Sequence, residues 1–160
     1  MPAQPLTPNR HLRSLLATLL LCFATGSITA QPPTDVVVEA REALRKKDAP
    51  RLAQLRERAI GHQHPLAQWV DYWELGNRLA QAQQPELDTF YGRWSGSYVE
   101  DRLRNDWLLE LGKRRDWANF TREFPRFRMN DDREVTCYAI LSEHLAAKEA
   151  GKELPPRAKS

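Results

Sequence analysis

Apolar residues recur every three to four positions along most of the chain, which is the spacing of one face of an amphipathic helix. This spacing predicts about seven short helices joined by turns, within the ranges 35–47, 48–61, 65–80, 85–95, 97–112, 116–124 and 131–151. No stretch alternates apolar and polar residues over four or more positions, as a strand with one buried face would. The pattern therefore predicts an all-α fold.

Residues that begin and end helices stand at these boundaries. Those that favour a first turn are Asp48, Pro65, Pro85, Ser97, Asp116 and either Asp131 or Asp132. Glycines that favour a helix end are Gly61, Gly96, Gly112 and Gly151. Ser97 and Glu100 together fit a capping box, in which each side chain accepts a hydrogen bond from the backbone at the helix start.

Length and composition limit how these helices are arranged. The chain has 160 residues, enough for one domain, and only 7 glycines, too few for a turn-rich β-sandwich or barrel. Seven short helices form either a closed bundle or a superhelical stack of hairpins. Trp73 and Trp107 lie 34 residues apart, the period of a common helical repeat, although the positions between them repeat poorly. We expect an irregular α-solenoid over residues 31–160.

The first thirty residues have the features of an export signal. Arg10 and Arg13 precede an apolar run at 15–23, which is too short to cross a hydrocarbon core of about 30 Å. Cleavage is predicted between Ala30 and Gln31, with 24–26 as the competing position. A lipoprotein signal places a small residue before its cysteine, whereas Cys22 follows leucines. We therefore expect a periplasmic protein without a stable membrane anchor.

The net charge is smaller once the predicted signal is removed. Of 24 basic and 21 acidic residues in the whole chain, residues 1–30 contain two arginines and no acid, so the remainder carries +1. A nucleic-acid partner is therefore not expected. Cys137 is left as the one cysteine of the mature chain, which in an oxidising compartment indicates a free thiol or a partner outside this sequence.

Candidate chemistry along the chain is sparse. His62 and His64 are two residues apart without a nearby cysteine or carboxylate cluster, and His64 is better placed to cap the helix after Pro65. Asp71 and Glu74 are three residues apart beside Arg78, as on a solvated helix face. Neither a nucleophile elbow nor a phosphate loop is present. We predict no catalytic residue, metal or cofactor.

Aromatic residues are the other candidates for ligand binding. Tryptophan faces stack on sugar rings as well as packing cores, and helical spacing favours the core. The segment 124–128, with the sequence FPRFR, alternates phenylalanine with arginine in a predicted loop. Such a loop could touch a glycan, a peptide or another domain, but a phenylalanine folded back over the core is the preferred interpretation.

Two stretches resemble a known family. HPLAQWVDYW at 64–73 and SYVEDRLRNDWLLELGKRRDWANF at 97–120, followed by Cys137-Tyr138, are similar to the N-terminal superhelical region of soluble lytic murein transglycosylases. The resemblance covers the chain from about Asp35 onward. It implies an exported enzyme that cleaves the MurNAc-GlcNAc bond of peptidoglycan to a 1,6-anhydro product, and it implies peptidoglycan glycan strands as partners.

The family's catalytic residues have no counterpart here. Its catalytic Glu lies in a lysozyme-like C-terminal domain and is followed by Ser, and this chain contains neither that Glu-Ser pair nor a Gly-Leu-Met-Gln motif. The resemblance also implies that Cys137 pairs with a cysteine beyond Ser160. We therefore expect a truncated helical scaffold whose catalytic domain is missing from this chain.

Two other functions fit the same helices. A free-standing periplasmic adaptor would bind a protein or peptide in the concave face of the stack. A closed bundle would instead bind a small ligand and would have a compact hydrodynamic radius. The substrate-binding residues, the exposure of each tryptophan and the oligomeric state do not follow from the sequence.

Overall fold

The computed structural model describes residues 35–152 of the chain, and this part is all-α. It contains seven α-helices: α1 Val36–Arg45, α2 Ala49–Gly61, α3 Ala67–Asn77, α4 Gln84–Arg93, α5 Tyr98–Arg114, α6 Trp117–Glu123 and α7 Arg133–Glu149. Two short 3-10 turns, η1 Leu79–Gln81 and η2 Phe124–Arg126, follow α3 and α6. The predicted signal cleavage site at Ala30 and Gln31 and the C-terminal end lie outside the described residues.

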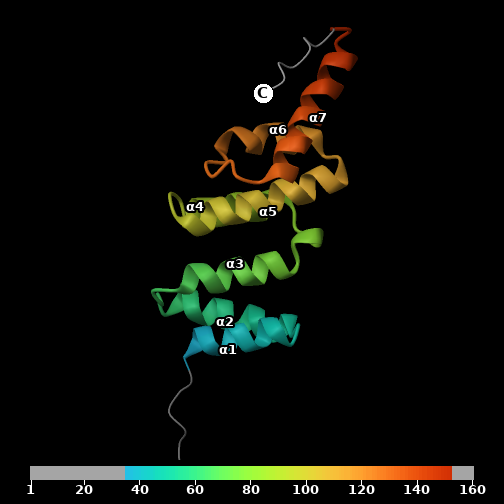
Figure 1. Cartoon of the computed structure of the whole chain (residues 1–160). Coiled ribbons are helices and arrows are strands. Elements are labelled where there is room, and N and C mark those ends of the chain that lie inside the picture. Colours follow the sequence, from blue (N-terminus) through green and yellow to red (C-terminus); the bar gives the residue numbers. More distant parts are fainter. Residues whose placement is uncertain (1–34, 153–160) are drawn as a thin grey trace, which may run out of the picture. The chain divides into compact units, whose positions relative to one another are not determined.

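Helices that are close in the sequence pack against one another (Figure 1). In the first group α1, α2 and α3 contact each other, and α3 then contacts α5. In the second group α5 contacts both α6 and α7. The all-α class is thereby confirmed for the described residues, while the superhelical stacking of hairpins stays a prediction.

Most of the predicted helix starts are confirmed. Asp35, Asp48, Asp116 and Asp132 each cap a helix by accepting a hydrogen bond from a backbone N–H near its start. At α5 the Ser97 hydroxyl accepts from the N–H of Glu100 (3.2 Å), and the Glu100 carboxylate accepts from the N–H of Gly96 (2.8 Å). The capping box is thus present, with its carboxylate shifted by one residue.

Two helices, the third and the fifth, have boundaries that differ from the prediction for a local reason. The third helix begins at Ala67 and stops at Asn77, because Leu79–Gln81 tightens into η1. The fifth does not end at Gly112 but continues to Arg114, and Arg115 adopts the left-handed conformation (φ 59°) that closes it. Gly112 lies inside the helix for another reason: a Cβ there would be 2.3 Å from the Tyr138 ring of α7.

The buried apolar residues form two clusters. One joins α1, α2 and the first half of α3, and consists of Ala40, Ala43, Leu52, Leu55, Ala59, Ala67 and Val70. The other joins Leu75 to α4–α7 and includes Phe90, Leu103, Trp107, Leu111 and Phe120. Trp94 packs against both clusters. The junction between the two therefore lies along α3 and at the end of α4.

Within residues 35–152, no helix is long and apolar enough to cross a membrane.

Candidate functional site

Asp71 stands at the junction of the two clusters and is buried, with only 1% of its surface exposed. It accepts hydrogen bonds from Arg56 Nε of α2 (2.5 Å), Arg93 Nη1 of α4 (2.6 Å) and Trp94 Nε1 (2.7 Å). The prediction of a solvated face for Asp71 and Glu74 is therefore wrong. Burial of a carboxylate is tolerated here because partners on two other helices converge on it.

The hollow beside Asp71 is fully matched in charge. It has a volume of about 150 Å³, and its charged lining consists of Arg56, Arg78 and Arg93 with Asp71, Glu74 and Glu86. Arg78 donates to Glu74 (2.7 Å) and also to Glu86, and this second bond lowers the pKa of Glu86. Since every acid here has an arginine partner, this hollow is a structural junction.

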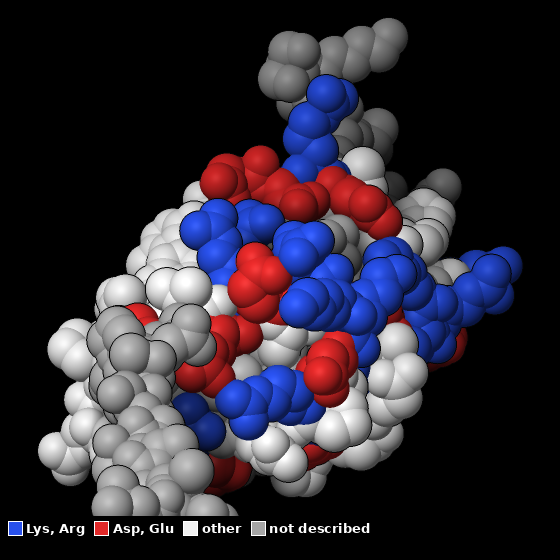
Figure 2. Space-filling model, turned by 90° about the horizontal axis from the view of Figure 1, so that it is seen from below, with Lys and Arg blue, Asp and Glu red and all other residues white. Residues whose placement is uncertain are grey.

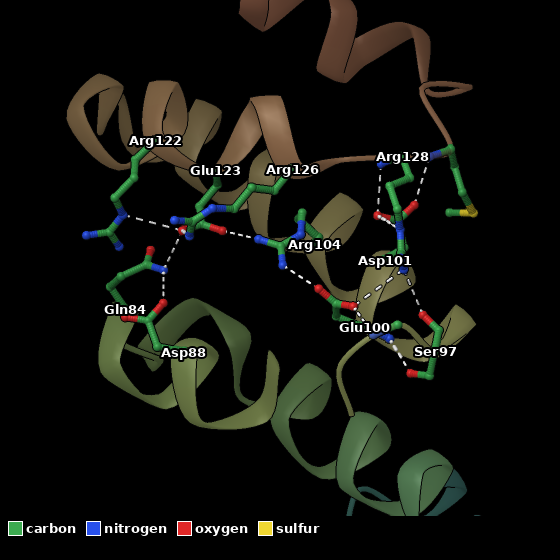
Figure 3. Close-up of polar contacts among 12 residues, drawn as sticks. Gln84, Asp88, Ser97, Glu100, Asp101, Arg104, Arg122, Glu123, Arg126 and Arg128 are labelled. Carbon is green, nitrogen blue, oxygen red and sulfur yellow. Dashed lines mark hydrogen bonds and ion pairs between the residues drawn. The ribbon is translucent and has the colours of Figure 1, made fainter. Parts of the chain in front are cut away.

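A second buried carboxylate, Glu123, lies between α6 and α5 with no exposed surface. It accepts a hydrogen bond from Arg104 of α5, which is also buried, and another from Gln84 Nε2 of α4 (3.0 Å). Arg122 (3.4 Å) and Arg126 (3.6 Å) approach it from its own segment. Figure 3 shows Arg104, Arg122 and Arg126 meeting at Glu123, with Gln84 and Asp88 beneath.

The same network reaches the loop after η2. Arg104 also donates to Glu100 (2.7 Å), and the buried Asp101 accepts from the backbone N–H groups of Arg128 (2.9 Å) and Met129 (2.8 Å). This anchors the loop 127–130 and holds Phe127 in the core, whereas residues 124–126 of the predicted loop form η2. The preferred interpretation of the FPRFR segment is thereby confirmed (Figure 3).

A hollow of about 350 Å³ opens beside this network, lined by Asp88, Tyr91, Arg104, Arg122 and Arg126. Two buried donors next to it, the Tyr91 hydroxyl and Arg104 Nε, have no hydrogen-bond partner. Sequence reasoning missed this site. Arg126 lies in the loop predicted from the sequence, and nothing in the sequence brought Tyr91 and Arg104 together with it.

The tryptophans differ in burial, which the sequence did not predict. Trp107 is fully buried, whereas Trp69, Trp73, Trp94 and Trp117 are partly buried. Trp69 packs against Tyr98, with ring centroids 6.1 Å apart, and Tyr98 is 59% exposed. An aromatic surface is therefore open to solvent where α3 meets the start of α5.

The remaining sequence candidates carry no site. His64 Nδ1 accepts from the N–H of Leu66 (3.1 Å), so it caps the turn before α3, which begins two residues later than predicted. The Cys137 thiol is exposed and free among the described residues. Within this part of the chain no three metal-ligating side chains converge.

Charge on the surface is locally compensated. In Figure 2 basic side chains form a band across the middle of the face, and acidic side chains lie among them. Ion pairs within and between α1 and α2 are examples, with Arg45 bound to Glu42 (2.8 Å) and Arg51 bound to Glu39 (2.5 Å). Such exposed pairs contribute little to stability.

Comparisons with known proteins return no family model, no curated protein and no solved structure that matches this chain. The resemblance to lytic transglycosylases therefore stays a prediction from the sequence motifs.

Proposed function

We propose that this chain is an N-terminal helical scaffold of a periplasmic lytic transglycosylase, which positions glycan strands of peptidoglycan for a catalytic domain outside these residues. The observation that supports it is the packing of the motif residues themselves. Tyr138 lies against Gly112, and its ring is 6.3 Å from that of Trp117 and 6.4 Å from that of Phe120.

Gly112, Trp117 and Phe120 come from the motif segment at 97–120 and Tyr138 from the Cys137-Tyr138 pair, and together they join α5, α6 and α7. Gly112 allows Tyr138 to approach the backbone of α5, and the aromatic rings of α6 pack on the other side of it. Residues with this arrangement serve to fix the angle between helices. Their role supports a scaffold over a catalytic function for the segment.

The pair formed by the exposed Tyr98 and the partly buried Trp69 is the surface that we assign to glycan contact. Both residues belong to the motif segments, and an exposed aromatic face can stack on the apolar face of a sugar ring. Trp69 is itself supported by Tyr72, whose ring packs edge-on against it at 6.0 Å. Tyr72 in turn donates to Asp106 of α5 (2.7 Å). The aromatic surface is thus held by two helices.

The test is a pull-down of the purified protein on insoluble peptidoglycan sacculi, with the supernatant examined for anhydro-muropeptides by mass spectrometry. We expect the protein to bind and to release no anhydro product. Tyr98→Ala should weaken binding about fivefold to tenfold, the loss of one aromatic contact. Leu141→Ala is the matched control, because Leu141 is another large exposed apolar residue, on α7.

Two results would contradict this proposal. If the protein does not bind sacculi, or if Tyr98→Ala binds as well as the unchanged protein, the assigned surface is wrong. Release of anhydro-muropeptides would contradict the scaffold role, because it requires a catalytic acid within the chain.

A further inference from the structure

The hollow beside Glu123 has features of a ligand site that the Asp71 junction lacks. The Tyr91 side chain is 7% exposed and that of Arg104 is almost fully buried, yet the Tyr91 hydroxyl and Arg104 Nε have no hydrogen-bond partner. Buried donors are nearly always paired, so an unpaired one calls for an acceptor that is not part of the protein. Two such donors stand beside the same hollow.

The position of Tyr91 is fixed by its neighbours. The guanidinium carbon of Arg104 lies 3.9 Å from the centre of the Tyr91 ring, and the ring of Phe90 packs against it edge-on. Burial raises the pKa of the Tyr91 hydroxyl, so this group stays protonated and acts as a donor. The hydroxyl oxygen has less than 1 Å² of accessible surface, so a side chain at the rim has to move before an acceptor can reach it.

The two arginines at the rim, Arg122 and Arg126, are only weakly bound to Glu123. Arg122 and Arg126 approach Glu123 only at 3.4 and 3.6 Å, longer than a good charge-assisted hydrogen bond, and both side chains are largely exposed. Both side chains line the hollow. Planar guanidinium groups of this kind match the two oxygens of a carboxylate.

The local charge selects the class of anion. Arg104, Arg122 and Arg126 contribute three positive charges, while Asp88 and Glu123 contribute two negative ones. Glu100, which binds Arg104 from the far side, is matched by Arg128 (3.4 Å). Arg128 also pairs with the buried Asp101 (3.6 Å), so the network as a whole is neutral, and only the lining of the hollow together with Glu123 has an excess of one positive charge. This excess fits a carboxylate, which carries one negative charge, better than phosphate, which carries nearly two at neutral pH.

We propose that this hollow binds the carboxylate of an acylated amino acid or peptide, with the Tyr91 hydroxyl donating to one oxygen and the guanidinium groups of Arg122 and Arg126 to the other. Asp88 stands at the rim on α4, one turn before Tyr91, where its carboxylate can accept the amide N–H of such a ligand. This site goes beyond the proposed glycan-guiding function and does not rest on it.

The experiment is a titration of the purified protein with N-acetyl-alanine, followed by calorimetry and by NMR of the arginine side-chain N–H groups. We expect saturable binding at millimolar concentrations, with the Nε–H signals of Arg122 and Arg126 shifted. Acetate, N-acetyl-alaninamide and inorganic phosphate are the other probes. The neutral amide should not bind, and phosphate should bind more weakly than N-acetyl-alanine.

Acetate distinguishes the carboxylate of an acylated residue from a small free carboxylate. If N-acetyl-alanine binds more tightly than acetate, the site takes an acylated residue, as proposed. Equal binding would show that the site takes small free carboxylates and would overturn the part of the proposal that concerns a peptide.

Three variants give the proposal its controls. Tyr91→Phe removes only the hydroxyl and should weaken binding about tenfold, without lowering the thermal midpoint of unfolding. Arg126→Gln, at the surface, should weaken it to a similar extent. Arg133→Gln removes an exposed positive charge outside the hollow, and its affinity should equal that of the unchanged protein. If Tyr91→Phe and Arg126→Gln bind like Arg133→Gln, or if the neutral amide binds equally well, the proposal is wrong.

Discussion

Asp71 and Glu123 are both buried carboxylates that join three helices, yet their surroundings differ in one respect. Asp71 receives hydrogen bonds from Arg56, Arg93 and Trp94, and both of its arginine partners reach solvent. Glu123 is paired with Arg104, which is itself buried and leaves its Nε unpaired beside the unpaired Tyr91 hydroxyl.

This difference distinguishes the structural junction at Asp71 from a ligand site at Glu123. Around Asp71 each charged group has its partner, so the only consequence of the network is that α2, α3 and α4 are held together. Around Glu123 the network also holds helices together, but it leaves donors that no protein group uses. Unused buried donors are unfavourable for stability alone, so their presence points to a ligand.

The comparison predicts unequal costs for removing the two charges. Glu123→Gln should lower the free energy of unfolding by about 3 kcal/mol, because the buried Arg104 loses one of its two carboxylate partners and cannot turn to water. Asp71→Asn should cost less, about 2 kcal/mol, since Arg56 and Arg93 are partly exposed and can be hydrated. Urea unfolding followed by circular dichroism measures both.

Both substitutions keep the shape of the side chain, so each serves as the control for the other. An Asp71→Asn protein as unstable as Glu123→Gln would mean that exposure of the arginine partners does not matter. The contrast between the two networks would then have no energetic basis.

A second difference between the regions lies in their helical glycines. Gly112 of α5 sits under the ring of Tyr138, where a Cβ would be 2.3 Å from Cδ2, whereas a Cβ on Gly76 of α3 would contact nothing within 4 Å. Gly112→Ala should therefore cost about 2 kcal/mol, because α5 and α7 must move apart. Gly76→Ala should instead stabilise the protein by about 0.5 kcal/mol, since alanine favours the helix.

Thermal unfolding of the two variants tests this contrast directly. If Gly112→Ala leaves the thermal midpoint of unfolding unchanged, Tyr138 can move away from α5 without loss of stability. The packing of α5, α6 and α7, which supports the scaffold proposal, would then contribute little to the free energy of unfolding.

The helices of the molecule could be predicted from the sequence because their signals are local. Asp48, Ser97 and Asp116 lie next to the backbone groups that they cap, so a short window of sequence contains both partners. Buried apolar residues such as Leu55 and Trp107 likewise follow from helical spacing.

The two polar networks could not be predicted in the same way. Asp71 has the same local spacing as a solvated acid, and its burial depends on Arg56, 15 residues before it, and Arg93, 22 residues after it. Arg104 and Glu123 are 19 residues apart and meet only after α5 and α6 have packed. Periodicity gives the face on which a residue lies, but not the partner that this face will meet.

The smallest of the expected effects concerns the caps of one helix in each region. Asp48 of α2 accepts one backbone hydrogen bond (3.0 Å), from Arg51, whereas Asp132 of α7 accepts two, at 2.8 and 3.1 Å, and a third from Asn105 of α5 (3.2 Å). Asp132→Ala should cost about 1.5 kcal/mol and Asp48→Ala about 0.7 kcal/mol. Asp131→Ala removes an adjacent exposed charge and should leave the stability unchanged.

The effect of Asp132 should also depend on pH. The hydrogen bond from the N–H of Val135 lowers the pKa of the Asp132 carboxyl below its ordinary value, so the carboxylate stabilises the folded state at neutral pH. Below about pH 4 this contribution is progressively lost, as protons bind the unfolded chain first and then the folded one. Urea unfolding at pH 7 and near pH 3 should therefore show the gap between Asp132→Ala and Asp131→Ala shrinking. A gap that stays constant would mean that Asp132 fixes α7 through its shape and its bond to Asn105, not through its charge.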